Sequence, residues 1–127
     1  MSSPTIDQIA DRLFAAMEAG DVEAIAAMWA RDVAVWHCAA GESTGRTGAL
    51  AMIQWMVANS LDRRYHLIAR HEFDGGFVQQ HLLRSTALDG TTVTVRVAII
   101  VLVGADGLIT RMDEYLDPAA LAALLSR

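Results

Sequence analysis

Three short turn motifs divide the second half of this 127-residue chain, and they constrain the fold more than any other feature. Asp74-Gly75-Gly76, Asp89-Gly90 and Asp106-Gly107 place glycine after aspartate, which is typical of tight β-hairpin turns. The segments between these turns are rich in branched and aromatic residues and therefore favour strands. Strands joined by tight turns pair with their neighbours, so we expect an antiparallel sheet. The predicted strands are 65–73, 77–86, 91–103 and 108–116.

The first half of the chain carries apolar residues mainly at helical spacing. Ser3 or Thr5 can cap the first helical segment, and Gly20 ends it. Asp21 can cap the second helix, and Asp117 can cap the last. The predicted helices are 5–19, 22–30, 47–59 and 119–125, and a further strand, 32–38, lies between the second helix and a loop over 41–48.

Helices kept apart from an antiparallel sheet indicate an α+β fold, and the length of the chain fits one domain, residues 1–127. We expect a cone-shaped barrel, in which three N-terminal helices pack on a curved, mostly antiparallel sheet and a short C-terminal helix follows. A twisted sheet around helices leaves a cavity between the layers. The hydrophobic share of 54% suggests a lined cavity, an oligomer interface or both.

Charge, hydropathy and cysteine usage narrow the partners and the location of the protein. The net charge is −5 and no basic face is visible, so we expect no nucleic-acid binding. No apolar run reaches the length of a membrane span, so we expect no membrane partner. Cys38 is the single cysteine and cannot form an internal disulfide, which suggests a reducing compartment and a cytoplasmic protein.

Four motifs together carry a resemblance to a known superfamily. They are Ala19-Gly20-Asp21, Trp29-Ala30-Arg31-Asp32, Gly45-Arg46-Thr47-Gly48 and the C-terminal segment 106–118. In this order they resemble the nuclear-transport-factor-2-like superfamily, which includes ketosteroid isomerases, limonene-epoxide hydrolases and SnoaL-type polyketide cyclases. The resemblance covers nearly the whole chain. It implies one deep apolar pocket that binds a small organic molecule, with chemistry that differs between members.

His37 is the first candidate for a catalytic residue. Strand alternation places Val33, Val35 and His37 on one face. His37 follows Asp32 by five residues, an offset at which the resemblance implies a proton-shuttling carboxylate in ketosteroid isomerases and a water-holding amide in epoxide hydrolases. An imidazole in the cavity can act as a general base or acid near neutral pH. The alternative is a histidine that binds a backbone carbonyl or faces a partner subunit.

Glu114 is the second candidate, on the last predicted strand. It resembles the inward carboxylate of the epoxide hydrolases and shares a face with Met112 and Leu116. A carboxylate in an apolar cavity should have a raised pKa, which suits acid–base work. The alternative is a structural salt bridge, to Arg46 or Arg84.

His81 is the third candidate, with Gln79 on the same strand face. The epoxide hydrolases that this chain resembles carry an arginine and an aspartate there, so their triad is not intact. A register slip would instead turn Gln80, Leu82 and Arg84 inward, but that would bury an arginine without an obvious partner. We therefore expect His81 inside.

The remaining predicted pocket residues are substrate-binding. The resemblance places an oxyanion-holding acid of ketosteroid isomerases near Ile99, where no carboxyl group stands, and a tyrosine near Phe14. Steroid isomerisation by that mechanism is therefore not supported. The expected substrate contacts are Gln79, Val35, Phe14, Met17, Trp55, Tyr65, Ile99 and Met112.

These residues predict a cofactor-independent acid–base enzyme of isomerase, cyclase, lyase or hydratase type, acting on a small apolar molecule. His37 is the main base or acid, and Glu114 and His81 supply the complementary proton or orient the substrate. One alternative is a module that binds a ligand without turnover. Another is an epoxide hydrolase, with water held between Glu114 and His37 and His81 as the imidazolium acid.

Metal binding and self-association complete the expectations. A divalent ion between His37, His81 and Glu114 is conceivable, but no tight ligand spacing supports it, so we expect neither metal nor cofactor. The resembling families are usually homodimers. An apolar outer sheet face with Ala98, Ile100 and Leu102 favours the same for this chain.

Overall fold

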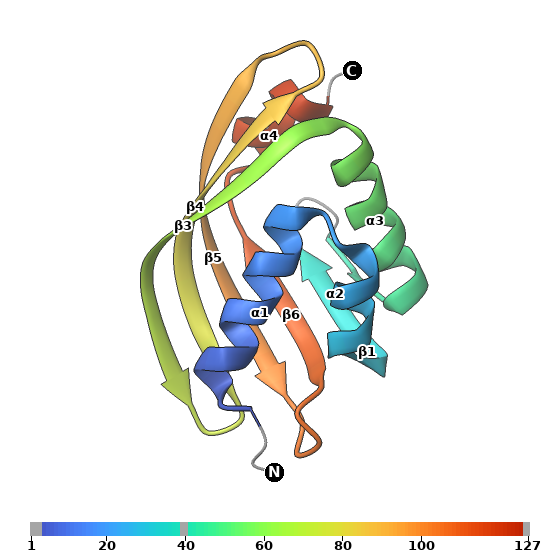
Figure 1. The fold of residues 1–127 in the computed structure, drawn as a ribbon, viewed down its shortest axis with the longest axis vertical. Coiled ribbons are helices and arrows are strands. Elements are labelled where there is room, and N and C mark those ends of the chain that lie inside the picture. The colour runs from blue at the N-terminus through green and yellow to red at the C-terminus, as the bar shows by residue number, and fades with distance from the viewer. Residues whose placement is uncertain (1–3, 39–40, 126–127) are drawn as a thin grey trace.

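The computed structural model of the chain describes residues 4–38 and 41–125 (Figure 1). Within these ranges the elements follow the predicted order of helices first and strands later. The helices are α1 (Ile6–Ala19), α2 (Val22–Met28), α3 (Arg46–Ala58) and α4 (Pro118–Leu125), and the strands are β1 (Trp29–His37), β2 (Ser43–Thr44), β3 (Ser60–Phe73), β4 (Gly76–Ala87), β5 (Thr92–Val103) and β6 (Ile109–Tyr115).

The six strands form one mixed sheet in the order β2-β1-β6-β5-β4-β3. β3, β4, β5 and β6 pair antiparallel with their sequence neighbours, as the three turn motifs predict. Gly90 and Gly107 adopt φ values of 90° and 83°, a region that side-chain-bearing residues rarely enter. β1 joins the other edge of β6 in parallel, which completes an α+β fold with a curved sheet.

The helices lie on one face of the sheet (Figure 1). The buried side of α1, including Leu13 and Phe14, packs with Ile99 and Val101 of β5 in the main core. At the other end of the sheet, Ala120 of α4 packs against the inner residues of β4 and β5. The opposite face of the sheet is left without a helix in the described part of the chain.

The predicted helix caps agree with the structure. Thr5 caps α1, since its hydroxyl accepts a hydrogen bond from the amide of Gln8 at 3.1 Å and the Gln8 side chain returns one to the Thr5 amide. Asp21 caps α2 in the same way, through the amide of Ala24. The alternative cap, Ser3, lies outside the described residues.

The start of β3 and the junction of α2 with β1, which begins at Trp29 rather than 32, differ most from the prediction, because arginines satisfy backbone groups there. β3 begins at Ser60 rather than 65, and its buried Arg63 donates to the carbonyl of Met17 near the end of α1 at 3.2 Å. α2 ends at Met28 rather than 30, where Arg46 donates to the carbonyl oxygens of Ala26 and Trp29. Charged residues in 60–64 therefore concealed the start of the strand.

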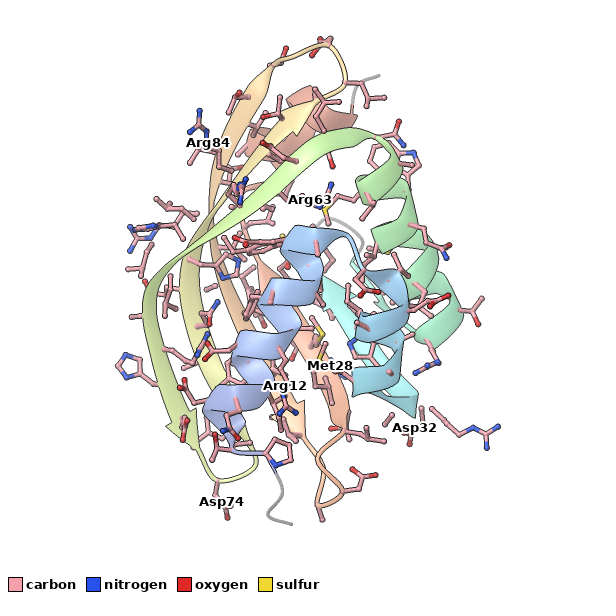
Figure 2. The ribbon with its side chains drawn as sticks, viewed as in Figure 1. Arg12, Met28, Asp32, Arg63, Asp74 and Arg84 are labelled. Atoms are coloured by element: carbon pink, nitrogen blue, oxygen red, sulfur yellow. The ribbon has the colours of Figure 1, made fainter. Side chains whose placement is uncertain are left out.

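Figure 2 shows how differently two arginines are placed. Arg63 lies between α1 and α3, whereas Arg84 projects outward from the sheet. Because Arg84 is exposed, β4 does not adopt the alternative register that would turn this arginine inward. None of the helices in the described ranges combines the length and the apolar character that crossing a membrane requires.

Candidate active site

A pocket of about 400 Å³ lies between the inner face of the sheet and α3. Its walls are mostly apolar, and four methionines contribute to them: Met17, Met52, Met56 and Met112. Such a volume suits a small organic ligand, and flexible thioether side chains allow the walls to adapt to its shape.

His37 and Glu114 meet in this pocket because β1 and β6 are parallel neighbours and the two residues are paired in register. The imidazole Nε2 and the carboxylate Oε1 are 3.0 Å apart. Their side chains are 17% and 31% exposed, so Glu114 is the more accessible of the two. Neither Arg46 nor Arg84 takes the place of His37, since Arg46 binds backbone carbonyls and Arg84 points outward.

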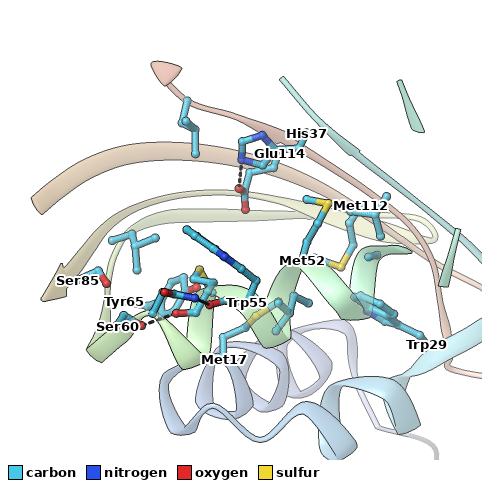
Figure 3. Close-up of a pocket in the computed structure, with 17 residues that line it drawn as sticks. Met17, Trp29, His37, Met52, Trp55, Ser60, Tyr65, Ser85, Met112 and Glu114 are labelled. Atoms are coloured by element: carbon cyan, nitrogen blue, oxygen red, sulfur yellow. Dashed lines mark hydrogen bonds and ion pairs between the residues drawn. The ribbon is translucent and has the colours of Figure 1, made fainter. Parts of the chain in front are cut away.

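Figure 3 shows how the pair faces the pocket. In this view the Glu114 carboxylate lies between the imidazole ring of His37 and the indole of Trp55. The hydrogen bond with Glu114 raises the pKa of His37 above its ordinary value of 6.5, although burial acts in the opposite direction. The imidazolium form is therefore favoured at neutral pH relative to an exposed histidine.

Tyr65 of β3 contributes a phenol to the same pocket. Burial, with a smaller contribution from the charge of Glu114, raises the pKa of Tyr65 far above its ordinary value of 10.0. The phenol is therefore neutral throughout the physiological range. Its hydroxyl makes no hydrogen bond to the described residues, which leaves it available to a ligand.

His81 and Gln79 point inward, in the favoured register, but neither of them lines the main pocket. Both are almost fully buried, at 1% and 2% exposure, while Gln80 on the other face is exposed. The His81 ring packs against the rings of Phe14 and Tyr65, with centroids 5.1 Å away in each case. The expectation that His81 reaches the ligand therefore differs from the structure, because an aromatic layer separates them.

Burial also lowers the pKa of His81 below 6.5, so its imidazole is neutral at physiological pH. The role of an imidazolium acid, which the epoxide hydrolase alternative assigned to it, does not fit this environment. The alternative of a metal ion between His37, His81 and Glu114 is not supported by the geometry either. Within residues 4–38 and 41–125, no three histidine, cysteine or acidic side chains are placed to hold an ion together.

Five of the eight predicted substrate contacts line the main pocket: Val35, Met17, Trp55, Tyr65 and Met112. The other three do not. Ile99 is buried in the sheet opposite Glu114, whereas Phe14 and Gln79 line a second pocket of about 250 Å³ between α1 and β3. Tyr65 lines both pockets.

Most of the α3 wall and one buried tryptophan were not predicted from the sequence. Ala49, Met52, Ile53 and Met56 line the pocket at helical spacing, a pattern that could have marked this face of the helix. Met52 and Trp55 remain more than 40% exposed because they border an open pocket rather than the core. Trp29 also lines the pocket, although it begins β1 instead of lying near the end of the helix predicted over 22–30.

Comparisons with known proteins show which family and which solved structures this chain resembles. The model of the SnoaL-like domain family matches residues 10–112. The comparison with curated proteins found no match.

Several solved structures share the NTF2-like α+β fold. A candidate SnoaL-like polyketide cyclase from Shewanella denitrificans is similar at a TM-score of 0.83 and 12% identity, covering 98% of both chains. An NTF2-like protein of unknown function from Burkholderia pseudomallei has a TM-score of 0.83 at 18% identity, covering 98% of this chain and all of that one (100%). PrhC from Penicillium brasilianum has a TM-score of 0.84 at 12% identity, covering 95% and 85% of the two chains.

Proposed function

This chain belongs to the SnoaL-like domain family, and on that premise we propose that it is a cofactor-independent acid–base enzyme acting on a small apolar organic molecule. The observation that carries the proposal is the His37–Glu114 pair, 3.0 Å apart in an apolar pocket of about 400 Å³. A proton-exchanging pair in such a pocket is what isomerisation, cyclisation or elimination needs. The cone shape and the single domain expected from the sequence are part of this proposal.

Within the pair, Glu114 is the group that meets the substrate and His37 is its partner. Glu114 is the more accessible side chain, and its Oε1 is held by Nε2 of His37. Glu114 accepts a proton from a carbon next to a carbonyl, and the His37 imidazolium holds the carboxylate in orientation through their 3.0 Å contact. The residue pattern alone favoured His37 as the main base or acid, whereas the base proposed here lies on the neighbouring strand.

Tyr65 donates a hydrogen bond to the substrate oxygen on which negative charge develops. Its neutral phenol faces the pocket, and no carboxyl group stands at Ile99 to serve instead. A fixed donor aimed at a developing oxyanion typically contributes about 2.7–4 kcal/mol to the lowering of the barrier.

The substrate class is an apolar molecule that carries at least one carbonyl group. Val35, Met17, Trp55 and Met112 supply apolar contacts to its body. The similar protein from Shewanella denitrificans is described as a candidate polyketide cyclase, and polyketides have carbonyl groups of the kind that this mechanism requires. The single cysteine, Cys38, suits a reducing compartment and supports the proposal that the reaction takes place in the cytoplasm.

Proton exchange tests the proposal even while the product of the reaction is unidentified. A panel of apolar ketones and β-dicarbonyl compounds is incubated with the protein in deuterated buffer, and deuterium incorporation next to the carbonyl is followed by NMR. Glu114→Gln should lower the exchange rate by about 10²-fold or more. The matched control is Asp113→Asn, one position earlier on β6 and paired with Arg111 instead of His37. Full exchange activity in Glu114→Gln would refute the proposal.

A ligand-binding module without turnover remains the second candidate, favoured by the mostly apolar wall of the pocket. It predicts saturable binding of the same compounds, no exchange above the buffer rate, and affinities that Glu114→Gln leaves unchanged. The two candidates therefore give opposite results with one pair of proteins.

A homodimer is also proposed. Ala98, Ile100 and Leu102 lie on the sheet face that no described helix covers, and Val78 of β4 lies opposite Ile100. The Trp36 and Tyr115 rings, with centroids 4.9 Å apart, extend the aromatic and apolar surface toward β1. A second copy of the chain is the expected occupant of this face.

A further inference from the structure

A line of polar side chains runs from the surface of α1 to the aromatic layer beneath the main pocket. At its outer end, Nη1 of Arg70 is 2.6 Å from a carboxylate oxygen of Asp7 and 2.8 Å from one of Asp11. The Arg70 side chain is only 9% exposed, so its guanidinium is held in one place by the two carboxylates. Arg70 and Asp11 also line the second pocket.

The next link fixes the orientation of the Gln79 amide. Nε of Arg70 donates to the side-chain oxygen of Gln79 at 2.8 Å. A guanidinium has only donors, so the amide oxygen must face Arg70 and the amide nitrogen must face inward. The reverse orientation would place a donor against a donor inside the protein and leave a buried acceptor unsatisfied, which is strongly unfavourable.

The Gln79 amide in turn fixes the proton of His81. The amide nitrogen of Gln79 is 3.0 Å from Nδ1 of His81, and both side chains are almost fully buried. An amide nitrogen can only donate, so Nδ1 must accept and the imidazole proton must lie on Nε2. That Nε2 has no hydrogen-bond partner in the described part of the chain.

The inner end of the line contacts the phenol of the proposed active site. The rings of His81 and Tyr65 pack edge to face, and Phe14 completes a triangle with a centroid 5.4 Å from that of Tyr65. Along the inner face of β4, His81 lies between Gln79 of the second pocket and Leu83 of the main pocket. The three rings therefore form the wall that separates the two pockets.

We propose that Arg70 and Gln79 lock His81 as the neutral Nε2–H tautomer, and that His81 in this form is a positioning residue for Tyr65. The first part is a property of the fold alone, whereas the second rests on the proposed function. Arg70 thereby influences Tyr65 in the main pocket through Gln79 and His81, without contacting a ligand itself.

A neutral imidazole matters because of the charges around it. Glu114 of β6 attracts a proton to His81, and Tyr65 of β3 would ionise more readily beside a cation. α1 contributes the uncharged Phe14 at this contact, and β5 places Val97 opposite His81. The donor from Gln79 therefore opposes formation of an imidazolium, whose charge beside the Tyr65 ring would weaken Tyr65 as a neutral donor.

The first experiment reads the tautomer directly from the ¹⁵N shifts of the His81 ring, assigned by comparison with His81→Gln. The wild-type protein should show protonated Nε2 and unprotonated Nδ1 at neutral pH. Gln79→Glu keeps the shape and still accepts from Arg70, but it presents an acceptor to Nδ1, so Nδ1 should become protonated. Gln80→Glu is the matched control, since Gln80 binds Arg96 on the exposed face and should leave His81 unchanged. A protonated Nδ1 in the wild type, or equal spectra for both variants, overturns the proposal.

A second pair of variants covers the case in which Gln79→Glu does not fold. Arg70→Met releases the Gln79 amide, so the single tautomer should become a mixture of both. Arg96→Met removes the corresponding arginine from Gln80 and should change nothing at His81. An unchanged single tautomer in Arg70→Met overturns the assignment of Arg70.

The positioning of Tyr65 is read in a Tyr115→Phe background, which leaves Tyr65 as the single tyrosine. Its ring NMR signals should move in Gln79→Glu and stay in place in Gln80→Glu. With a turned-over ketone, Gln79→Glu should lower kcat by about tenfold while KM stays within about twofold. Absence of turnover in every protein would refute the proposed function but leave the tautomer result standing, whereas unmoved Tyr65 signals would refute the positioning role.

Discussion

At the scale of single residues, the proposed chemistry of the pocket depends on the different electrostatic surroundings of two histidines. His37 shares a hydrogen bond with an acidic side chain and has a raised pKa, while His81 receives a hydrogen bond from an amide in an apolar layer and has a lowered pKa. The sequence showed both as inward histidines on strands. The partner of His37 is on another strand, and the contact of His81 with Gln79 depends on the exact register. The opposite pKa shifts of the two histidines therefore could not be predicted from the sequence.

The raised pKa of His37 predicts a pH profile for the proposed reaction. If Glu114 is the base and His37 acts as imidazolium, kcat must fall as pH rises through a value above 6.5. If His37 itself were the base, kcat would rise over the same interval. The profile is measured by deuterium exchange, with His66→Gln as the control at an exposed histidine of β3. A rise in kcat across neutral pH would exclude the assigned roles.

Stability should also depend on pH through His81. Its pKa is lower in the folded than in the unfolded chain, so the unfolded chain binds protons more readily. The free energy of unfolding should therefore fall as pH decreases below about 6.5, the unfolded value. His37 has the opposite sign, since it contributes stability that is lost as pH rises through its raised pKa. Urea titrations of His81→Gln should show a weaker loss toward acid than the wild type, and an equal or stronger loss would contradict this explanation.

At the scale of elements, the sequence predicted the turns and strand faces well because these depend on neighbouring residues. Alternation placed His37 with Val35, and Glu114 with Met112, on faces that line one pocket in the structure. The parallel pairing of β1 with β6 joins segments far apart in the chain, and no local pattern contains it. The start of β3 was missed for a related reason, since Arg63 looks like a surface residue until the carbonyl groups that it binds are known.

Arg63 should therefore be important for stability although it lies outside the pocket. It donates to the carbonyl of Met17 and to the hydroxyl of Ser60, and it is buried. Arg63→Met should lower the free energy of unfolding by about 2–4 kcal/mol, because buried acceptors at the end of α1 would lose their donor. Urea denaturation measures the change, and Arg64→Met at the exposed neighbouring position should cost less than about 0.5 kcal/mol. Similar losses for both variants would mean that these bonds do not stabilise the fold.

At the scale of the whole molecule, one face of the sheet is used by the helices and the pocket, and the other has no cover in the described part of the chain. Strand alternation makes this division, since Val97, Ile99 and Val101 point inward and Ala98, Ile100 and Leu102 point outward. A sequence pattern can therefore identify an apolar outer face, but which surface covers it depends on geometry between molecules.

The proposed homodimer gives the prediction that tests this outer face. Ile100 lies near its middle, between Val78 of β4 and Asp113 of β6. A glutamate there would bury a charge against the same residue of the second copy, so Ile100→Glu should shift the protein from dimer to monomer. Light scattering should give twice the chain mass of 13.7 kDa for the wild type and about 13.7 kDa for the variant at micromolar concentration. Arg84→Glu, which introduces the same residue at an exposed position toward the end of β4, should remain dimeric. Circular dichroism must show that Ile100→Glu keeps its fold, and a wild-type protein that is monomeric under the same conditions would leave the apolar face without the partner assigned to it.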